Sequence, residues 1–132
     1  MVGDLNMNPY DAGVLSSEAL HAISSRFRAG RQSRIVQGRK RKFFHNPAWK
    51  LLAEQPNGVA GSYFHHGSGP NEAFWHLFDQ VLVRPALIDR FDGESLRIVT
   101  GFGATSLVAN EGLPDRQFSD HLPITFEIRN TV

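Results

Sequence analysis

The sequence has no cysteine among its 132 residues. A disulfide framework, a thiol nucleophile and a cysteine-ligated zinc site are therefore excluded, and a reducing compartment is favoured. No apolar run approaches the length of a membrane span, and the first residues lack the charged-then-apolar pattern of a secretion signal. We therefore predict a cytoplasmic protein without a membrane span.

Net charge is also small, because 14 Lys and Arg residues stand against 13 Asp and Glu residues, which gives +1. This balance singles out no partner through the field of the whole protein. With 41% hydrophobic residues, the chain is long enough for one globular domain with a core.

The positive charges are nevertheless unevenly spread along the chain. Eight of the fourteen cations fall within residues 26–42: Arg26, Arg28, Arg31, Arg34, Arg39, Lys40, Arg41 and Lys42. Such a cluster can neutralise phosphates, with Arg39, Lys40 and Arg41 as candidate contacts to a substrate such as nucleic acid. It can equally be a solvated charged loop, and the sequence leaves both interpretations open.

A first group of polar residues follows Val2 and Gly3 directly. In an extended backbone Asp4 and Asn6 would point the same way, and Gly3 would let another backbone or a ligand come close. The stretch therefore predicts a strand end that presents two polar groups. The alternative is an Asx-type turn without chemistry, because Asp and Asn are common turn formers.

Several helices and strands can be placed from local signals. Leu20, Ile23 and Phe27 share one face at helical spacing, which predicts a helix from Ser16 or Ser17 to Gly30. Asn46 followed by a proline predicts a second helix start. A short strand is expected at 61–64, a helical turn at 85–88, a strand near 96–100 and a loop over 101–118.

Two further polar groups lie in or beside apolar strands. Residues 78–83 indicate a buried strand with Asp79 inside it, and a buried carboxylate needs a partner. Residues 122–128 alternate apolar and polar positions, as in a half-buried strand, with Asp120 and His121 at its start. His65 and His66 are adjacent, so they would face opposite sides of a strand; a surface loop near a cleft is favoured there over a metal site.

Three pieces, taken in this order, resemble the endonuclease/exonuclease/phosphatase superfamily, which includes exonuclease III-like and DNase I-like enzymes. They are Gly3-Asp4-Leu5-Asn6, Phe78-Asp79-Gln80 and Ser119-Asp120-His121. The resemblance covers essentially the whole chain and implies an α/β fold: the second half of a four-layer sandwich, with one mixed, mainly antiparallel sheet and flanking helices. Residues 1–132 would be the C-terminal half of the domain, with the N-terminal half absent.

The resemblance also implies divalent-metal-dependent hydrolysis of phosphate esters, with Mg²⁺ or Mn²⁺. Asp4 would deprotonate the attacking water, and Asn6 would hydrogen-bond a phosphoryl oxygen. Asp120 would lie at the metal. His121 would contact the scissile phosphate, with Asp79 hydrogen-bonded to its other ring nitrogen.

The first hypothesis is therefore a phosphodiesterase, most simply a nuclease. We expect little or no activity from this chain alone, because the family's first half supplies an Asn and a Glu metal ligand. A second hypothesis is a non-catalytic half-domain that forms a homodimer, or pairs with the missing half, through an exposed apolar sheet face. A third is a lipid or inositol phosphatase whose specificity lies in the loop at 56–73.

Overall fold

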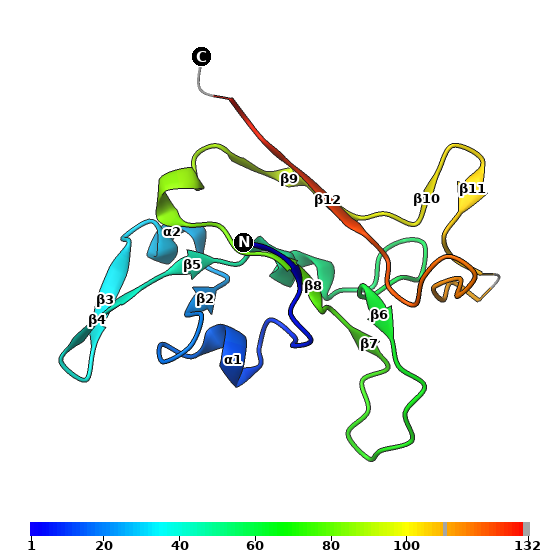
Figure 1. Ribbon diagram of the computed structural model, residues 1–132, viewed down its shortest axis with the longest axis horizontal. Helices are drawn as coiled ribbons and strands as arrows, with labels where there is room; N and C mark the ends of the chain where they lie inside the picture. The colour runs from blue at the N-terminus through cyan, green and yellow to red at the C-terminus, as the bar shows by residue number, and fades with distance from the viewer. Residues whose placement is uncertain (110, 131–132) are drawn as a thin grey trace.

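The protein, described here by a computed structural model of residues 1–109 and 111–130, combines short strands and short helices joined by long loops (Figure 1). The helical segments are α1 (Ala12–Leu15), α2 (Arg26–Ala29) and the 3₁₀ turns η1 (Pro47–Leu51) and η2 (Pro85–Leu87). The first strands are β1 (Val2–Asp4), β2 (Ala22–Ile23), β3 (Ser33–Val36), β4 (Arg39–Lys42), β5 (Phe44–His45) and β6 (Tyr63–Phe64). The later strands are β7 (Trp75–His76), β8 (Asp79–Val81), β9 (Phe91–Ile98), β10 (Gly101–Phe102), β11 (Thr105–Ser106) and β12 (Ile124–Ile128).

Within these residues the strands form two-stranded ladders, of which only β2–β5 is parallel. A mixed α and β fold with mainly antiparallel pairing is therefore observed. The single mixed sheet that was expected is not seen among the described residues, because the ladders are short and separated by turns. Isolated bridges connect some of them: His45 pairs with Val83 beyond β8, and Tyr63 of β6 pairs with His121 before β12.

Strand β8 lies at the centre of the packing and is buried on both sides. Val81 and Val83 belong to the largest core cluster, whereas Leu82 points into a second cluster with Val14 and Phe44. Alternate residues of a strand face opposite sides, so the apolar residues 81–83, which end β8 and follow it, are covered on both faces, whereas Asp79 and Gln80 need polar partners. This agrees with the buried strand predicted over 78–83, and it places Asp79 on the same side as Val81.

The helix predicted from Ser16 or Ser17 to Gly30 is wrong. The chain turns after α1, His21 has a positive φ of 52°, and residues 22–23 pair with β5 instead. Only the last turn is helical, as α2, whose N-cap Ser25 accepts a hydrogen bond from the amide of Arg28. Phe27 is 74% exposed, so the apolar spacing did not reflect one buried face. Pairing with a distant strand outweighs local helical preference here.

Other local predictions are confirmed. Asn46 caps η1 by accepting a hydrogen bond from the amide of Ala48. The strand near 61–64, the turn near 85–88 and the strand near 96–100 appear as β6, η2 and the end of β9. The expected loop over 101–118 contains a small hairpin, β10–β11, whose turn uses Gly103 with φ 58°.

Candidate functional site

Asp79 and His121 lie in contact although 42 positions separate them. The Nδ1 atom of His121 is 2.7 Å from Oδ2 of Asp79, and the side chains are 25% and 20% exposed, respectively. This is the partner that a carboxylate in an apolar strand requires. An imidazole held in this way has one nitrogen fixed by the carboxylate, which leaves Nε2 for another ligand.

Ser62 brings these two residues together. Its hydroxyl accepts a hydrogen bond from the amide of Asp79 at 3.1 Å, and its carbonyl accepts one from the amide of Leu122 at 2.7 Å. Ser62 is fully buried, so both bonds are shielded from water. It therefore ties β8 to the segment that carries His121. The sequence analysis did not single out Ser62, because nothing local distinguishes it from a loop serine.

Asp4 lies directly opposite Asp79 in the antiparallel β1–β8 ladder. Residues opposite one another in such a pair point to the same face, and two carboxylates there repel. The pairing thus places Asp4 beside the Asp79–His121 contact, and a positive charge on His121 would offset the repulsion.

Asn6 does not continue the strand, contrary to the extended geometry expected for it. Its φ is 50°, and its amide donates to Oδ1 of Asp4 at 2.8 Å. The Asx-type turn that the sequence also allowed is therefore present. It keeps exposed Asn6 close to Asp4 by bending the chain rather than by strand alternation.

Asp120 is exposed and precedes His121 in a tight turn, in which the amide of His121 donates to Oγ of Ser119 at 3.0 Å. A pocket of about 430 Å³ adjoins this turn. Its lining comprises Asp79, Phe102, Leu107, Phe118, Ser119, His121, Leu122 and Pro123. The pocket gives a small ligand access to the dyad of Asp79 and His121.

Two aromatic rings, those of Tyr63 and Phe78, pack near the imidazole of His121. Its ring centroid lies 4.8 Å from that of Tyr63 and 6.3 Å from that of Phe78, and these two rings stack at 5.3 Å. Such packing restricts the imidazole to one orientation. Tyr63 is a second residue that sequence analysis missed.

A buried polar network holds the loop after β1. The side chain of Gln80, which is fully buried, donates to the carbonyls of Met7 and Leu77 and accepts from Asn46. Asn8 lies beyond it, and its Oδ1 accepts from the amide of Leu77 at 2.9 Å. These bonds fix the path of the chain immediately after Asp4 and Asn6.

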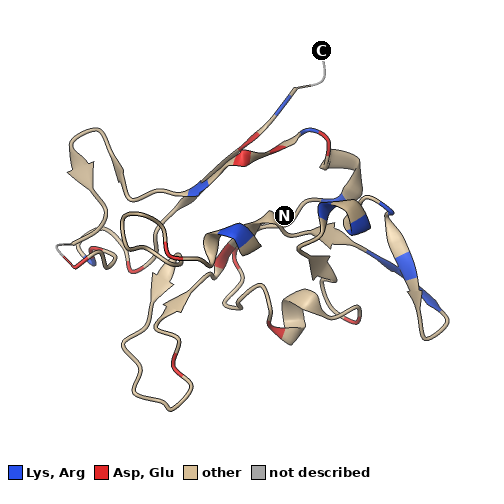
Figure 2. Cartoon of the chain, turned by 180° about the vertical axis from the view of Figure 1, so that it is seen from behind, with Lys and Arg blue, Asp and Glu red and all other residues tan. Residues whose placement is uncertain are grey.

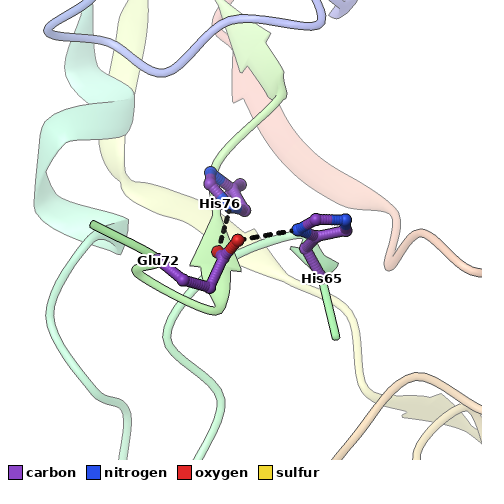
Figure 3. Close-up of side chains that lie close together, drawn as sticks. All are labelled: His65, Glu72 and His76. Atoms are coloured by element: carbon purple, nitrogen blue, oxygen red, sulfur yellow. Dashed lines mark hydrogen bonds and ion pairs between the residues drawn. The ribbon is translucent and has the colours of Figure 1, made fainter. Parts of the chain in front are cut away.

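A second cluster of ionisable side chains lies on the β6–β7 hairpin, with His76 in β7 and the other two residues in the connecting loop (Figure 3). Oε2 of Glu72 is 2.8 Å from Nδ1 of His65, and its Oε1 is 3.2 Å from Nε2 of His76. The imidazole of His65 and the amide of Phe74 hold the pKa of Glu72 down, at about 2. The sequence indicated only the adjacent His65 and His66; the partners of His65 instead come from seven and eleven positions further on, which only the hairpin brings together.

The ligand atoms of His65, Glu72 and His76 all lie within 4.8 Å of one another, close enough to hold a metal ion. The surroundings of His76 oppose this use. Asn8 must present its amide group to Nδ1 of His76, at 3.0 Å, because its oxygen is taken by the amide of Leu77. Nδ1 therefore accepts, and the proton of a neutral His76 sits on Nε2, the atom a metal would need.

Five of the eight basic residues of 26–42 fall on one hairpin, β3–β4: Arg34, Arg39, Lys40, Arg41 and Lys42. Arg39 and Lys40 are exposed, as expected of residues that contact a substrate. Arg41 instead forms an ion pair with Glu18 at 2.5 Å, and its side chain is only 23% exposed. The alternative of a solvated charged loop is only partly right, because these five cations lie on a regular two-stranded ribbon rather than in a loop.

No helix among the described residues has the length and apolar character needed to cross a membrane. Comparisons with protein families, curated proteins and solved structures found no match to the chain.

Proposed function

We propose that this chain carries part of the active site of a divalent-metal-dependent phosphoesterase, most simply a phosphodiesterase. The contact between Asp79 and His121 is the observation that carries this proposal. Asp79 holds Nδ1 of the imidazole in place and leaves Nε2 for a phosphate oxygen. The chain would correspond to the second half of the four-layer endonuclease/exonuclease/phosphatase domain.

Each residue of the site has a distinct part. Asp4 takes a proton from the attacking water, since its exposed carboxylate lies on the face it shares with Asp79. Asn6 donates its side-chain amide to a phosphoryl oxygen. His121 donates from Nε2 to the scissile phosphate while Asp79 holds its Nδ1.

Asp120 would hold the metal, together with water and phosphate oxygens. Magnesium, like manganese, favours oxygen ligands, and magnesium often uses only one or two carboxylates. Asp120 fits this because it is an exposed carboxylate with no ion-pair partner among the described residues. Bound Mg²⁺ or Mn²⁺ would supply charge stabilisation at the phosphoryl group.

The metal ligands available among the described residues also limit the turnover that we expect for phosphoester hydrolysis. The only group of three His, Asp or Glu ligands found in that part of the chain is His65, Glu72 and His76, and Asp120 is not in it. We therefore expect turnover by this chain alone to be slow at most.

The test is hydrolysis of bis(p-nitrophenyl) phosphate and nicking of plasmid DNA, with and without Mg²⁺. Magnesium-dependent hydrolysis that Asp120→Ala abolishes would support the proposal. Hydrolysis that survives both Asp120→Ala and Asp79→Asn would contradict it. If the protein instead preferred phosphomonoesters of inositol or lipid, the proposed active site would stand, but its substrates would be phosphomonoesters rather than phosphodiesters.

A further inference from the structure

The β3–β4 hairpin projects at one edge of the molecule, away from the β9–β12 ladder (Figure 1). All four residues of β4 are Lys or Arg, and β3 adds Arg34, so the hairpin carries a concentration of positive charge (Figure 2). Its turn residues Gln37 and Gly38 have φ of 47° and 75°, as a two-residue hairpin turn of type I′ requires. The cations are thus displayed on a regular ribbon whose register is fixed.

The register divides the ribbon into two faces. Arg34 stands opposite Arg41, and Val36 opposite Arg39. On this face Nε of Arg34 donates to Nε2 of buried His21 at 3.1 Å, and Arg41 pairs with Glu18. These two contacts anchor the base of the ribbon to the segment between α1 and β2. Arg34 and Arg41 are therefore positioning residues.

The other face and the tip leave their positive charges unneutralised. Lys40 stands opposite Ile35, and Lys42 opposite Ser33. Arg39, Lys40 and Lys42 are exposed, and within residues 1–109 and 111–130 none of them pairs with an acidic side chain. Lys40 and Lys42 also border a pocket of about 500 Å³ with Arg84.

Like charges held close together without counter-charges repel one another. Binding of an anion would therefore relieve this repulsion and stabilise the folded ribbon. One acidic residue, Asp89, also borders the pocket, but it lies 3.6 Å from Arg26. The ribbon thus offers several separate cations along an extended edge, a spacing that suits a chain of phosphates better than a single phosphate group.

We propose that the β3–β4 ribbon docks on duplex nucleic acid and contacts its phosphates through Arg39, Lys40 and Lys42. The major groove of B-form DNA admits a two-stranded ribbon, and cations on its outer face and tip can reach the flanking phosphates. Binding of single strands relies on aromatic stacking, and the two strands contain no aromatic residue.

This inference deepens the proposed function, because it names duplex nucleic acid as the substrate class. It also revises the set of candidate contacts. Arg41 leaves the set, since Glu18 already neutralises it, and Lys42 enters it. Contacts to phosphates carry no sequence information, so the ribbon binds duplexes of different sequence alike.

The test is fluorescence anisotropy of a labelled duplex of about 20 base pairs in EDTA, over a range of salt concentrations. EDTA prevents cleavage, so a failure of docking is distinguished from a failure of the catalytic proposal. The variant is Arg39→Ser with Lys40→Ser. Its matched control, Lys50→Ser with Arg97→Ser, removes the same charge from exposed positions outside the ribbon.

The ribbon variant should bind at least about tenfold more weakly, and the slope of log affinity against log salt should fall by about 2. The control should bind like the wild type. Circular dichroism checks that both variants fold. Equal binding by the two variants would overturn the proposal, and so would binding to phosphatidylserine vesicles in place of the duplex.

Discussion

Asp4 and Asp79 stand directly opposite each other in the β1–β8 ladder, and Asp79 in turn holds Nδ1 of His121 at 2.7 Å. Two facing carboxylates are unfavourable on their own. The imidazole beside them is the group that can offset this repulsion. The same arrangement places an acid, a histidine and the Asx turn of Asn6 at one strand end.

Asp79→Asn should weaken binding of inorganic phosphate by about tenfold. The amide keeps the size of the side chain but replaces the carboxylate that holds Nδ1 of His121, and a charge-assisted hydrogen bond contributes about 1.5–3 kcal/mol. Phosphate binding can be followed by isothermal titration calorimetry. Asp89→Asn is the control, because Asp89 is fully exposed on its side chain. Equal loss in both variants would mean that only net charge matters.

Ser62→Ala should lower the free energy of unfolding by about 1–3 kcal/mol, because the amide of Asp79 loses its acceptor, the hydroxyl of fully buried Ser62. Urea unfolding measures the change. Exposed Ser68→Ala should have almost no effect. If both variants were equally stable, Ser62 would not be the residue that ties β8 to the segment of His121.

Stability should fall as the pH is lowered through 6.5. Burial lowers the pKa of both His21 and His45 from 6.5, so the unfolded chain binds more protons than the folded one below that pH. Their contribution is fully present above 6.5 and is lost on acidification. Protonated His21 could no longer accept from Arg34, so the base of the ribbon should loosen as well.

Urea unfolding at about pH 7.5 and about pH 5.5 measures this effect. His45→Gln should reduce the difference between the two values, because a glutamine does not titrate. Exposed His66→Gln should leave the difference unchanged. A wild-type stability that rises on acidification would contradict the assignment.

Asn8→Asp should create a tighter zinc site at His65, Glu72 and His76. The new carboxylate would accept a hydrogen bond from Nδ1–H of His76 and leave Nε2 unprotonated for the metal, and such partners typically change affinity by about 10–100-fold. Zinc titration monitored by calorimetry gives the affinity. Adding Glu72→Gln should remove the gain. Tight zinc binding by the wild type would show that Asn8 does not oppose the metal.

Local signals in the sequence located much of the secondary structure. The cap at Asn46 and the apolar strand around Val81 are local properties, and the structure agrees with both. The polar residues of the candidate site could also be picked out, because each lies in or beside a predicted strand, although their proposed roles come from the resemblance of three short pieces to a known superfamily. Local signals failed where pairing with a distant segment decides, as it does for Ala22 and Ile23.

The supporting contacts could not be predicted, for a related reason. Ser62, Tyr63 and Asn8 act through partners between 15 and 69 positions away, and the identity of a single residue does not indicate those partners. The division of the basic hairpin into an anchored face and a free face likewise needs the register of its strands. The sequence shows where the charge is concentrated, but only the fold shows which cations are neutralised.

The most direct test of the central claim is a titration of ¹⁵N-labelled protein with inorganic phosphate in the presence of Mg²⁺. We predict shifts of the amide signals of Asn6, Asp120 and His121 that His121→Gln and removal of Mg²⁺ both diminish. Shifts that are confined to the β3–β4 ribbon, or that His121→Gln leaves unchanged, would contradict a phosphate site built on Asp79 and His121.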